Sequence, residues 1–333
     1  MAARCLFVAS TGGHLEELKR LRPALVPADA EVHWVTFESV SSRSSLANEP
    51  HVHFVPDVPP RGFVPLLKAF WPALLVLLRV RPRLVYSTGA AIALAVLPFA
   101  FLVRARATYI ESATRTDGPS VTGRLLTCVP WLRLRTQYQK WAGRRWKFSG
   151  SVFDQWHVVA APQRRTQIRK ILVTLGTQRE FPFISLVQRI QKIVPPGVEV
   201  FWQLGGGFPE EARPDGARDT VSLEQMREWV RAADAIVAHA GVGSALTLLA
   251  SGRTPVLVPR SAERGEHVDD HQEFLAEELV HRGLAVMATA DDLTWDDLLE
   301  STTYAVQPVI RPLHDELLDE TTDDDELVAA TAA

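Results

Sequence analysis

A glycine-rich turn between a buried-strand pattern and a helix pattern is the strongest chemical signal in the chain. It lies in AIVAHAGVGSALTLLASGRTPVLVP and contains His239, Gly241, Val242, Gly243 and Ser244. Glycine lets a ligand approach the backbone closely, and Ser244 is a plausible cap for a helix whose free N–H groups attract phosphate. The pattern predicts a phosphate-binding turn, although a strand–helix turn that binds nothing has the same sequence.

A second polar stretch, EHVDDHQEFLAEEL, follows the next strand pattern and should reach the same edge of the sheet. His267 and His271 have the i, i+4 spacing of a metal pair, with Asp269 and Asp270 beside them. No further His or Cys ligand is evident, and the stretch also suits an ordinary polar helix start. We therefore expect His271 and Gln272 to contact sugar hydroxyls, and we expect no metal site.

The third signal, STGGHLEELKRL, directly follows the first strand pattern. Gly12 and Gly13 permit a tight turn, and His14 opens a helix. A histidine at this place can be a base, a phosphate ligand or a mere helix cap. The stretch departs from the G-x-G-x-x-G dinucleotide fingerprint, which argues against a dehydrogenase.

The fourth signal is ATYIESATRTDGPSVTGRLL, in which Glu111 and Ser112 stand where a strand ends. Glu111 is either a solvated loop acid or a carboxylate that faces a cleft between two domains.

The elements that must position these residues alternate between strand and helix, which predicts an α/β fold with parallel sheets. The pattern restarts near residue 170, after VVAAPQRRTQIRK, which lacks an apolar period and resembles a linker. We predict two Rossmann-like domains with a cleft between them. Strands are expected at 5–10, 32–37, 51–56, 83–88, 107–112, 171–177, 198–205, 235–241 and 254–259. The predicted organisation is a first domain at 1–162, a linker at 163–167, a second domain at 168–312 and an acidic, disordered tail at 313–333.

Composition narrows the class of protein. The chain has 333 residues and only two cysteines, too few for a disulfide framework, and its first residues do not resemble a signal peptide, so we expect a cytoplasmic protein. Residues 61–150 carry a net charge of +13, whereas residues 263–333 carry −17. The basic segment predicts an anionic partner, and nucleic acid is the least favoured one because few aromatic residues accompany the cations.

Two apolar stretches raise the question of a membrane. Residues 84–103 are uncharged and long enough to span a bilayer, but the turn residues in Tyr86–Gly89 favour a buried strand, a turn and a helix broken at Pro98. Residues 62–83 mix aromatic, aliphatic and basic side chains. They are either core or a segment that lies on a membrane surface, and we favour the surface.

Together these stretches resemble the glycosyltransferases of family 28 type with the GT-B fold, which include the peptidoglycan N-acetylglucosaminyltransferase. The closest likeness is to the two-subunit transferase that adds the second N-acetylglucosamine to dolichol diphosphate, and to bacterial exopolysaccharide relatives. STGGHLEEL, RPRLVYSTG, YIESATR and SVTGRLL resemble the membrane-associated acceptor-side subunit. ILVTLGTQ, AHAGVGS, LVPRS and HVDDHQEFLAEEL resemble the donor-binding subunit. The resemblance covers about residues 4–287.

The resemblance implies an inverting transfer from a UDP-sugar of the GlcNAc, glucuronic acid or glucose type to a lipid-diphosphate-linked acceptor. It implies a peripheral enzyme on the inner face of the cell membrane that needs no metal. The donor would contact Gly176, Thr177, His239, Gly241, Val242, Gly243, Ser244, Thr247, His271 and Gln272. The acceptor would lie near Gly12, Gly13, Ser112, Arg115 and Arg124. The catalytic candidates are His14, whose ordinary pKa suits a base, and Glu111, the second choice of base or the group that orients His14.

One position departs from the family pattern. Relatives carry a glutamate six residues after the first glycine of AGxGS, where it holds the ribose, and this chain has Thr247. A hydroxyl makes one such bond where a carboxylate makes two. Thr247 thus raises the alternative of a non-catalytic nucleotide-sugar-binding partner subunit. The other alternative is a nucleotide-sugar epimerase, which can share the fold. The sequence leaves the donor sugar and the oligomeric state open.

Overall fold

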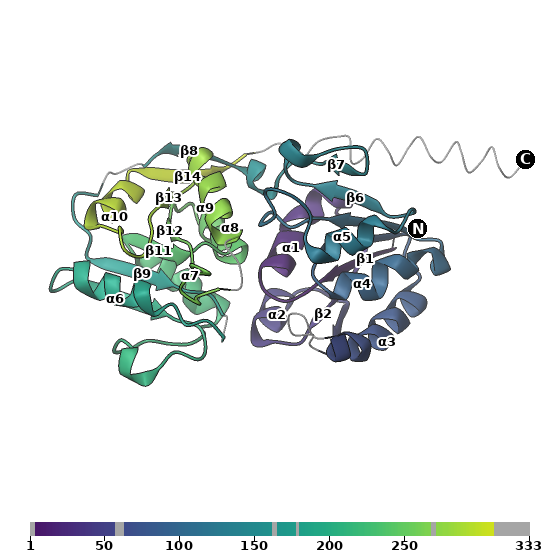
Figure 1. Ribbon diagram of the computed structural model, residues 1–333, viewed down its shortest axis with the longest axis horizontal. Helices are drawn as coiled ribbons and strands as arrows, with labels where there is room; N and C mark the ends of the chain where they lie inside the picture. Colours follow the sequence, from purple (N-terminus) through teal and green to yellow (C-terminus); the bar gives the residue numbers. More distant parts are fainter. Residues whose placement is uncertain (1–3, 57–62, 162–164, 178–179, 268–270, 310–333) are drawn as a thin grey trace, which may run out of the picture. The chain divides into compact units, whose positions relative to one another are not determined.

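The computed structural model describes residues 4–56, 63–161, 165–177, 180–267 and 271–309. The chain divides into two compact units between Gln155 and Trp156. Each unit is built on a parallel sheet covered by helices (Figure 1), so the predicted α/β fold class is confirmed. The acidic tail predicted at 313–333 lies outside the described residues, as do residues 163 and 164 of the predicted linker.

The first unit contains a seven-stranded sheet in the order β3-β2-β1-β4-β5-β6-β7, with all neighbours parallel. Its strands are β1 (Arg4–Ala9), β2 (Glu31–Phe37), β3 (Val52–Val55), β4 (Leu84–Gly89), β5 (Arg106–Ile110), β6 (Arg133–Thr136) and β7 (Trp146–Phe148). Its helices are α1 (Gly13–Leu25), α2 (Val40–Ser45), α3 (Phe63–Val80), α4 (Ile92–Val96) and α5 (Val121–Thr127), with 3-10 turns η1 (Leu97–Val103), η2 (Gln139–Trp141) and η3 (Val152–Gln155).

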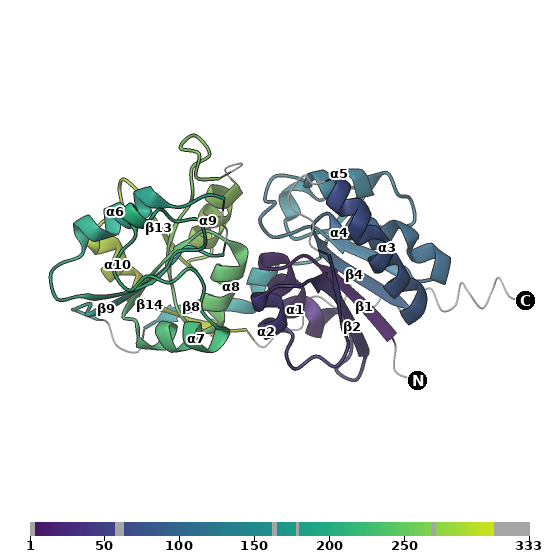
Figure 2. The ribbon, with the colours of Figure 1, turned by 90° about the horizontal axis from the view of Figure 1, so that it is seen from below.

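Alternating apolar residues bury both faces of this sheet, because successive side chains in a strand point to opposite sides. Leu6 and Val8 share one core with α3, α4, η1 and α5. On the other face Phe7 packs edge-on against Trp34 and Tyr86, with ring centroids 5.0 and 5.5 Å apart. Helix α1 covers this second face, and Figure 2 shows the sheet between the two layers of helices.

The second unit contains a five-stranded parallel sheet in the order β10-β9-β11-β12-β13. Its strands are β9 (Lys170–Thr174), β10 (Glu199–Gln203), β11 (Ala235–His239), β12 (Val256–Val258) and β13 (Val286–Met287). Its helices are α6 (Ile184–Ile193), α7 (Leu223–Ala232), α8 (Val242–Ala250), α9 (His271–His281) and α10 (Trp295–Ser301), with the 3-10 turn η4 (Glu210–Ala212).

A separate two-stranded sheet joins the beginning and the end of the second unit. Strand β8 (Trp156–Ala160) pairs antiparallel with β14 (Tyr304–Pro308). Neither strand was predicted from the sequence, in which Val158 to Ala160 belong to the stretch that resembles a linker. That reading is wrong, because these residues form a ladder with a segment distant in the sequence.

The apolar stretch at 84–103 forms β4, α4 and η1, as predicted, with Pro98 at the start of η1. Most of the second apolar stretch forms α3. Within the part of the chain that the structure describes, no helix is long and apolar enough to cross a membrane.

Candidate active site

Each parallel sheet reverses its strand order once, and some of the predicted site residues follow the strands at these two points. In the first unit the reversal lies between β1 and β4, and in the second it lies between β9 and β11. Open α/β sheets bind ligands beyond the carboxyl ends of the strands at such switch points. His14 comes soon after β1, Gly176 after β9 and Gly241 after β11. The fold thus brings these three residues to places suited to a ligand, whereas Glu111 follows β5 and His271 follows β12.

Two hydrogen bonds fix His14 at the first switch point. Its ring atom Nδ1 lies 2.8 Å from the carbonyl oxygen of Thr88, and the Thr88 hydroxyl donates to the His14 carbonyl at 2.7 Å. A carbonyl can only accept, so Nδ1 carries the proton and a neutral ring has its lone pair on Nε2. Gly89 completes the site, since a Cβ there would lie 3.1 Å from the imidazole. The helix cap is Gly12, not His14.

Glu111 is 1% exposed, so its reading as a solvated loop acid is wrong. Its carboxylate accepts hydrogen bonds from the Ser120 backbone N–H at 2.9 Å, the Ser120 hydroxyl at 3.1 Å and the Tyr109 hydroxyl at 3.2 Å. Burial raises the pKa of Glu111, and these hydrogen bonds oppose the rise. A Cβ at Gly123 would lie 2.2 Å from the carboxylate, so glycine is required there. Glu111 therefore anchors the loop that leads into α5.

A second buried carboxylate, Glu17, was missed by the sequence analysis. It accepts hydrogen bonds from the Ser112 hydroxyl at 2.9 Å, from the Ala113 backbone N–H at 2.8 Å and from the Gln137 amide. Burial is the largest influence and raises the pKa of Glu17 to about 7. The only signal in the sequence was its position among the leucines of LEELKRL, which puts an acid on the buried face of a helix. Glu17 ties α1 to the loop after β5.

The remaining predicted acceptor residues differ in their accessibility. Gly12 has φ +76°, which explains glycine at the turn, and Gly13 is the first residue of α1. Ser112 is buried and its hydroxyl donates to Glu17, so it has a packing role. Arg115 is half-buried, and Arg124 is exposed on α5. Contact of these residues with an acceptor stays a prediction.

At the second switch point, the imidazole of His239 lies between two glycines. A Cβ at Gly176 would lie 2.6 Å from the ring, and a Cβ at Gly241 would lie 2.3 Å from it. Burial, followed by the charge of Arg260, lowers the pKa of His239 to about 3, so the ring is neutral at neutral pH. The space beside these glycine α-carbons is therefore filled by protein.

Helix α8 begins with no side-chain cap. Gly241 is its N-cap residue and makes no side-chain hydrogen bond, so the prediction of Ser244 as the cap is wrong. Ser244 and Gly243 lie in the first turn, where backbone N–H groups lack partners within the helix. Thr247 lies one turn further and donates its hydroxyl proton to the Gly243 carbonyl at 2.8 Å.

Two buried residues that the sequence analysis missed fix the segment after β9. Arg260 is 1% exposed and donates to the carbonyls of Leu175, at 2.8 Å, and Phe181. Burial lowers the pKa of Arg260 to about 10, so it stays charged. Gln203 donates to the carbonyl of Gly176. The signal for Arg260 was its place in LVPRS, directly after a buried strand, which is an unusual environment for a guanidinium.

The predicted sugar-contacting residues surround the start of α9. Gln272 is buried and its amide oxygen accepts from the Arg260 backbone N–H at 3.2 Å. His271 is half-buried, and its ring centroid lies 4.7 Å from that of His267. Asp269 and Asp270 lie outside the described residues. Thr177 is exposed. Among the described residues, the group of three side chains placed to hold a metal lies elsewhere, in the first unit.

Comparison with known proteins shows which families and structures this chain is similar to. Residues 170–312 match the glycosyltransferase family 28 C-terminal domain. The UDP-N-acetylglucosamine–N-acetylmuramyl-(pentapeptide) pyrophosphoryl-undecaprenol N-acetylglucosamine transferase of Polaromonas naphthalenivorans is 26% identical over 330 residues, covering 87% of each chain. MurG of Acinetobacter baumannii aligns with a TM-score of 0.57 at 18% identity, over 97% of this chain and 94% of that one. The UDP-GlcNAc 2-epimerase of Methanocaldococcus jannaschii aligns with a TM-score of 0.52 at 11% identity, over 90% and 91%.

Proposed function

This chain is a glycosyltransferase of family 28 type with the GT-B fold, and from that premise we propose that it is an inverting enzyme that transfers a sugar from a UDP-sugar to a lipid-diphosphate-linked acceptor. GlcNAc, glucuronic acid and glucose are the donor sugars to test. The proposal is supported most by the positions of His14, Gly176 and Gly241, which follow strands at the switch points of the two sheets. The epimerase shares the fold only, and the matched domain is that of a transferase.

His14 is the proposed general base. With Nδ1 donating to the Thr88 carbonyl at 2.8 Å, the lone pair of the neutral ring is on Nε2, the atom that would take the proton of the acceptor hydroxyl. The hydroxyl oxygen then attacks the anomeric carbon as its bond to the diphosphate breaks, which inverts the configuration. Glu111 is buried and bonded to Ser120 and Tyr109, so we assign it to positioning.

The first turn of α8 is the proposed site for the donor diphosphate. Negative charge grows on the leaving phosphate, and free N–H groups at a helix start stabilise it. Gly243 leaves room for that approach, and this site needs no metal ion. Thr247 can accept one hydrogen bond from the ribose, because its own proton is donated to the Gly243 carbonyl.

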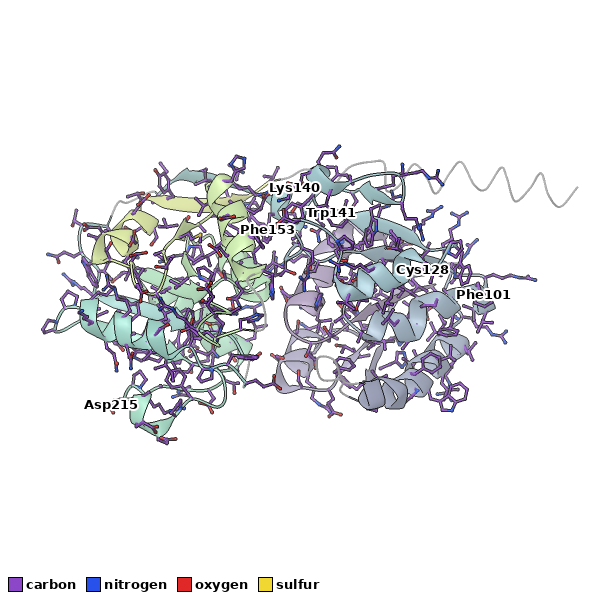
Figure 3. All side chains as sticks on the ribbon, in the orientation of Figure 1. Phe101, Cys128, Lys140, Trp141, Phe153 and Asp215 are labelled. Atoms are coloured by element: carbon purple, nitrogen blue, oxygen red, sulfur yellow. The ribbon has the colours of Figure 1, made fainter. Side chains whose placement is uncertain are left out.

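An exposed apolar surface supports membrane association at the cytoplasmic face. It consists of side chains from α3, η1, α5 and the segment after α5, all on one side of the first sheet: Trp71, Leu75, Leu78, Phe101, Leu102, Val121, Leu125 and Trp131. Phe101 lies at the surface of the first unit (Figure 3), with its ring 5.2 Å from that of Trp131. Exposed cations at Arg79, Arg104 and Arg124 suit anionic headgroups.

A transfer assay tests the proposal. Purified enzyme is incubated with each radiolabelled UDP-sugar and an extract of polyprenyl-diphosphate-linked saccharides, and the product is separated by chromatography. We expect label in the lipid fraction with one donor, and an inverted anomeric configuration by NMR. Exchange at the sugar C2 without an acceptor would instead identify an epimerase. Binding of UDP with no transfer to any acceptor would identify a partner subunit.

A further inference from the structure

Three histidines and a glutamate gather at the amino-terminal ends of β2 and β3, away from the switch point. Glu31 and His33 alternate on one face of β2, and His51 and His53 alternate along the neighbouring edge strand. The parallel register pairs Val35 with His53, which puts the four side chains on one face of the sheet. The sequence signature is E-x-H followed by H-x-H, which has the period of two of a strand. It differs from the i, i+4 spacing of a helical metal pair.

Close contacts join this cluster. The Nε2 atom of His33 lies 2.9 Å from a Glu31 carboxylate oxygen, and its Nδ1 lies 3.1 Å from Nε2 of His53. The ring of His51 stacks on that of His33, with centroids 4.4 Å apart and planes at 13°. One ligand atom from each of Glu31, His33 and His51 lies within 4.8 Å of the others.

We propose that Glu31, His33 and His51 form a binding site for a divalent transition-metal ion of the zinc class. A carboxylate only accepts, so a proton on His33 Nε2 occupies the line to Glu31 that a cation would take. A zinc ion needs His nitrogens at about 2.0–2.1 Å and carboxylate oxygens at about 2.0–2.2 Å. Because the rings of His33 and His51 are stacked with planes at 13°, one of them must turn so that the in-plane lone pairs of both reach the same ion. The two imidazole ligands favour zinc, nickel or copper over magnesium.

His53 would act as a positioning residue for this site. Its Nε2 atom faces Nδ1 of His33, the ring nitrogen that the metal would not use, and such partners fix the ring orientation of a ligand. Arg4 competes with the metal, because its Nε lies 3.2 Å from a Glu31 oxygen while its Nη1 donates to the Val80 carbonyl. The bound ion would link β3, an edge strand, to β2, and would serve structure or regulation and not sugar transfer.

Zinc titration of the full-length, tag-free protein tests the site. Competition with a chromophoric chelator should show one tightly bound Zn²⁺ per chain. His33→Ala and His51→Ala should each abolish that binding, whereas His53→Ala should weaken it by about 10- to 100-fold. Zinc should raise the melting temperature of the wild type and not that of His33→Ala. Circular dichroism checks that each variant folds, and Glu31→Gln, which keeps the shape of a half-exposed side chain, tests the carboxylate independently.

The matched control is the double variant His267→Ala/His271→Ala, which removes the helical histidine pair of the second unit. It should keep one Zn²⁺ per chain. Zinc K-edge absorption of the wild type should show two imidazole ligands with oxygen completing the shell. The proposal is overturned if the wild type binds no zinc, if His33→Ala retains it, or if the control loses it.

Discussion

The two units each place a histidine at the switch point of a parallel sheet, but they constrain it in opposite ways. His14 is held by a hydrogen bond to Thr88, and one neighbouring glycine leaves space for its ring. His239 is enclosed between Gly176 and Gly241, and its hydrogen-bond contact with a carbonyl is long, at 3.4 Å. In the first unit the hydrogen bond fixes which ring nitrogen of His14 carries the proton. In the second unit the two glycines leave the space that the His239 ring fills.

The two units also differ in which buried polar groups hold the backbone near the site. In the first, Glu17 and Glu111 accept hydrogen bonds from the backbone of the loop between β5 and α5. In the second, the guanidinium of Arg260 and the amide of Gln203 hold the backbone carbonyls. Buried anions that accept from N–H groups and buried donors that satisfy carbonyls are two ways to make a loop rigid. Transfer of a proton or of a phosphate-linked sugar requires that the residues in contact with the reacting groups are held rigidly.

Replacing His14 should give the largest effect. His14→Ala should lower kcat by about 10²- to 10⁴-fold, the range for loss of a general base, and leave UDP affinity unchanged. Steady-state kinetics and calorimetric titration with UDP measure the two quantities. Equal loss of both would place His14 in donor binding and would remove the contrast with His239.

Two glycine variants should distinguish a glycine that makes room for a protein side chain from a glycine that makes room for the ligand. Gly243→Val should abolish measurable UDP binding with little change in melting temperature, because the side chain blocks approach to the first turn of α8. Gly241→Ala should instead lower stability by about 1–3 kcal/mol, because its methyl group meets His239 at 2.3 Å. Thermal unfolding and UDP titration distinguish the two. Normal UDP affinity in Gly243→Val would make that turn purely structural.

The buried carboxylate of Glu17 predicts a pH dependence of stability. Its folded pKa of about 7 lies above its ordinary value of 4.5, so the folded state binds the proton more tightly than the unfolded state. The stabilisation is complete below pH 4.5 and is lost as the pH rises to 7, a contribution on the order of 3 kcal/mol. Glu17→Gln should flatten the urea-unfolding free energy over this window, and an unchanged slope would contradict the assignment.

Membrane binding should belong to the first unit. Replacing Arg79, Arg81 and Arg83 by Ser should weaken pelleting with anionic liposomes by up to about 1 kcal/mol per charge, and high salt should weaken binding of the wild type. Activity on long-chain acceptors should fall more than activity on short soluble ones. The matched control replaces Arg227 and Arg231 of α7, exposed cations of the second unit, by Ser. Wild-type protein that stays in the supernatant with every liposome would refute this prediction.

The smallest effect should come from restoring the family's ribose-binding residue. Thr247→Glu should tighten UDP binding by about 1 kcal/mol through a charged hydrogen bond to the ribose. Calorimetric titration with UDP and with a ribose-lacking analogue measures the gain. Weaker UDP binding would show that the pocket has been rebuilt around the threonine.

The sequence predicted nine of the twelve described strands of the two parallel sheets, because each of the nine has its own apolar run bounded by turn residues. The short strands β6, β7 and β13 were not predicted. Strands β8 and β14 were missed because their pairing joins residues such as Val158 and Val306 that are far apart in the chain. The positions of His14 and Gly241 could be predicted from the strand–turn–helix order. The role of Gly241 could not be predicted, because the sequence does not show that the ring of His239, at the end of the preceding strand, turns into the space beside it. Glu17 and Arg260 were missed because burial of a charge depends on long-range packing.

The pairing of β8 with β14 brings the first and last described strands of the second unit side by side, with Trp156 opposite Pro308. A domain whose two ends lie side by side can be replaced by a homologous domain without a change in the positions of the flanking segments. We therefore expect residues 156–309 to be interchangeable between homologues as one piece. If the proposed donor and acceptor sites belong to the second and first units, exchange of this piece should change the choice of donor and leave the choice of acceptor unchanged.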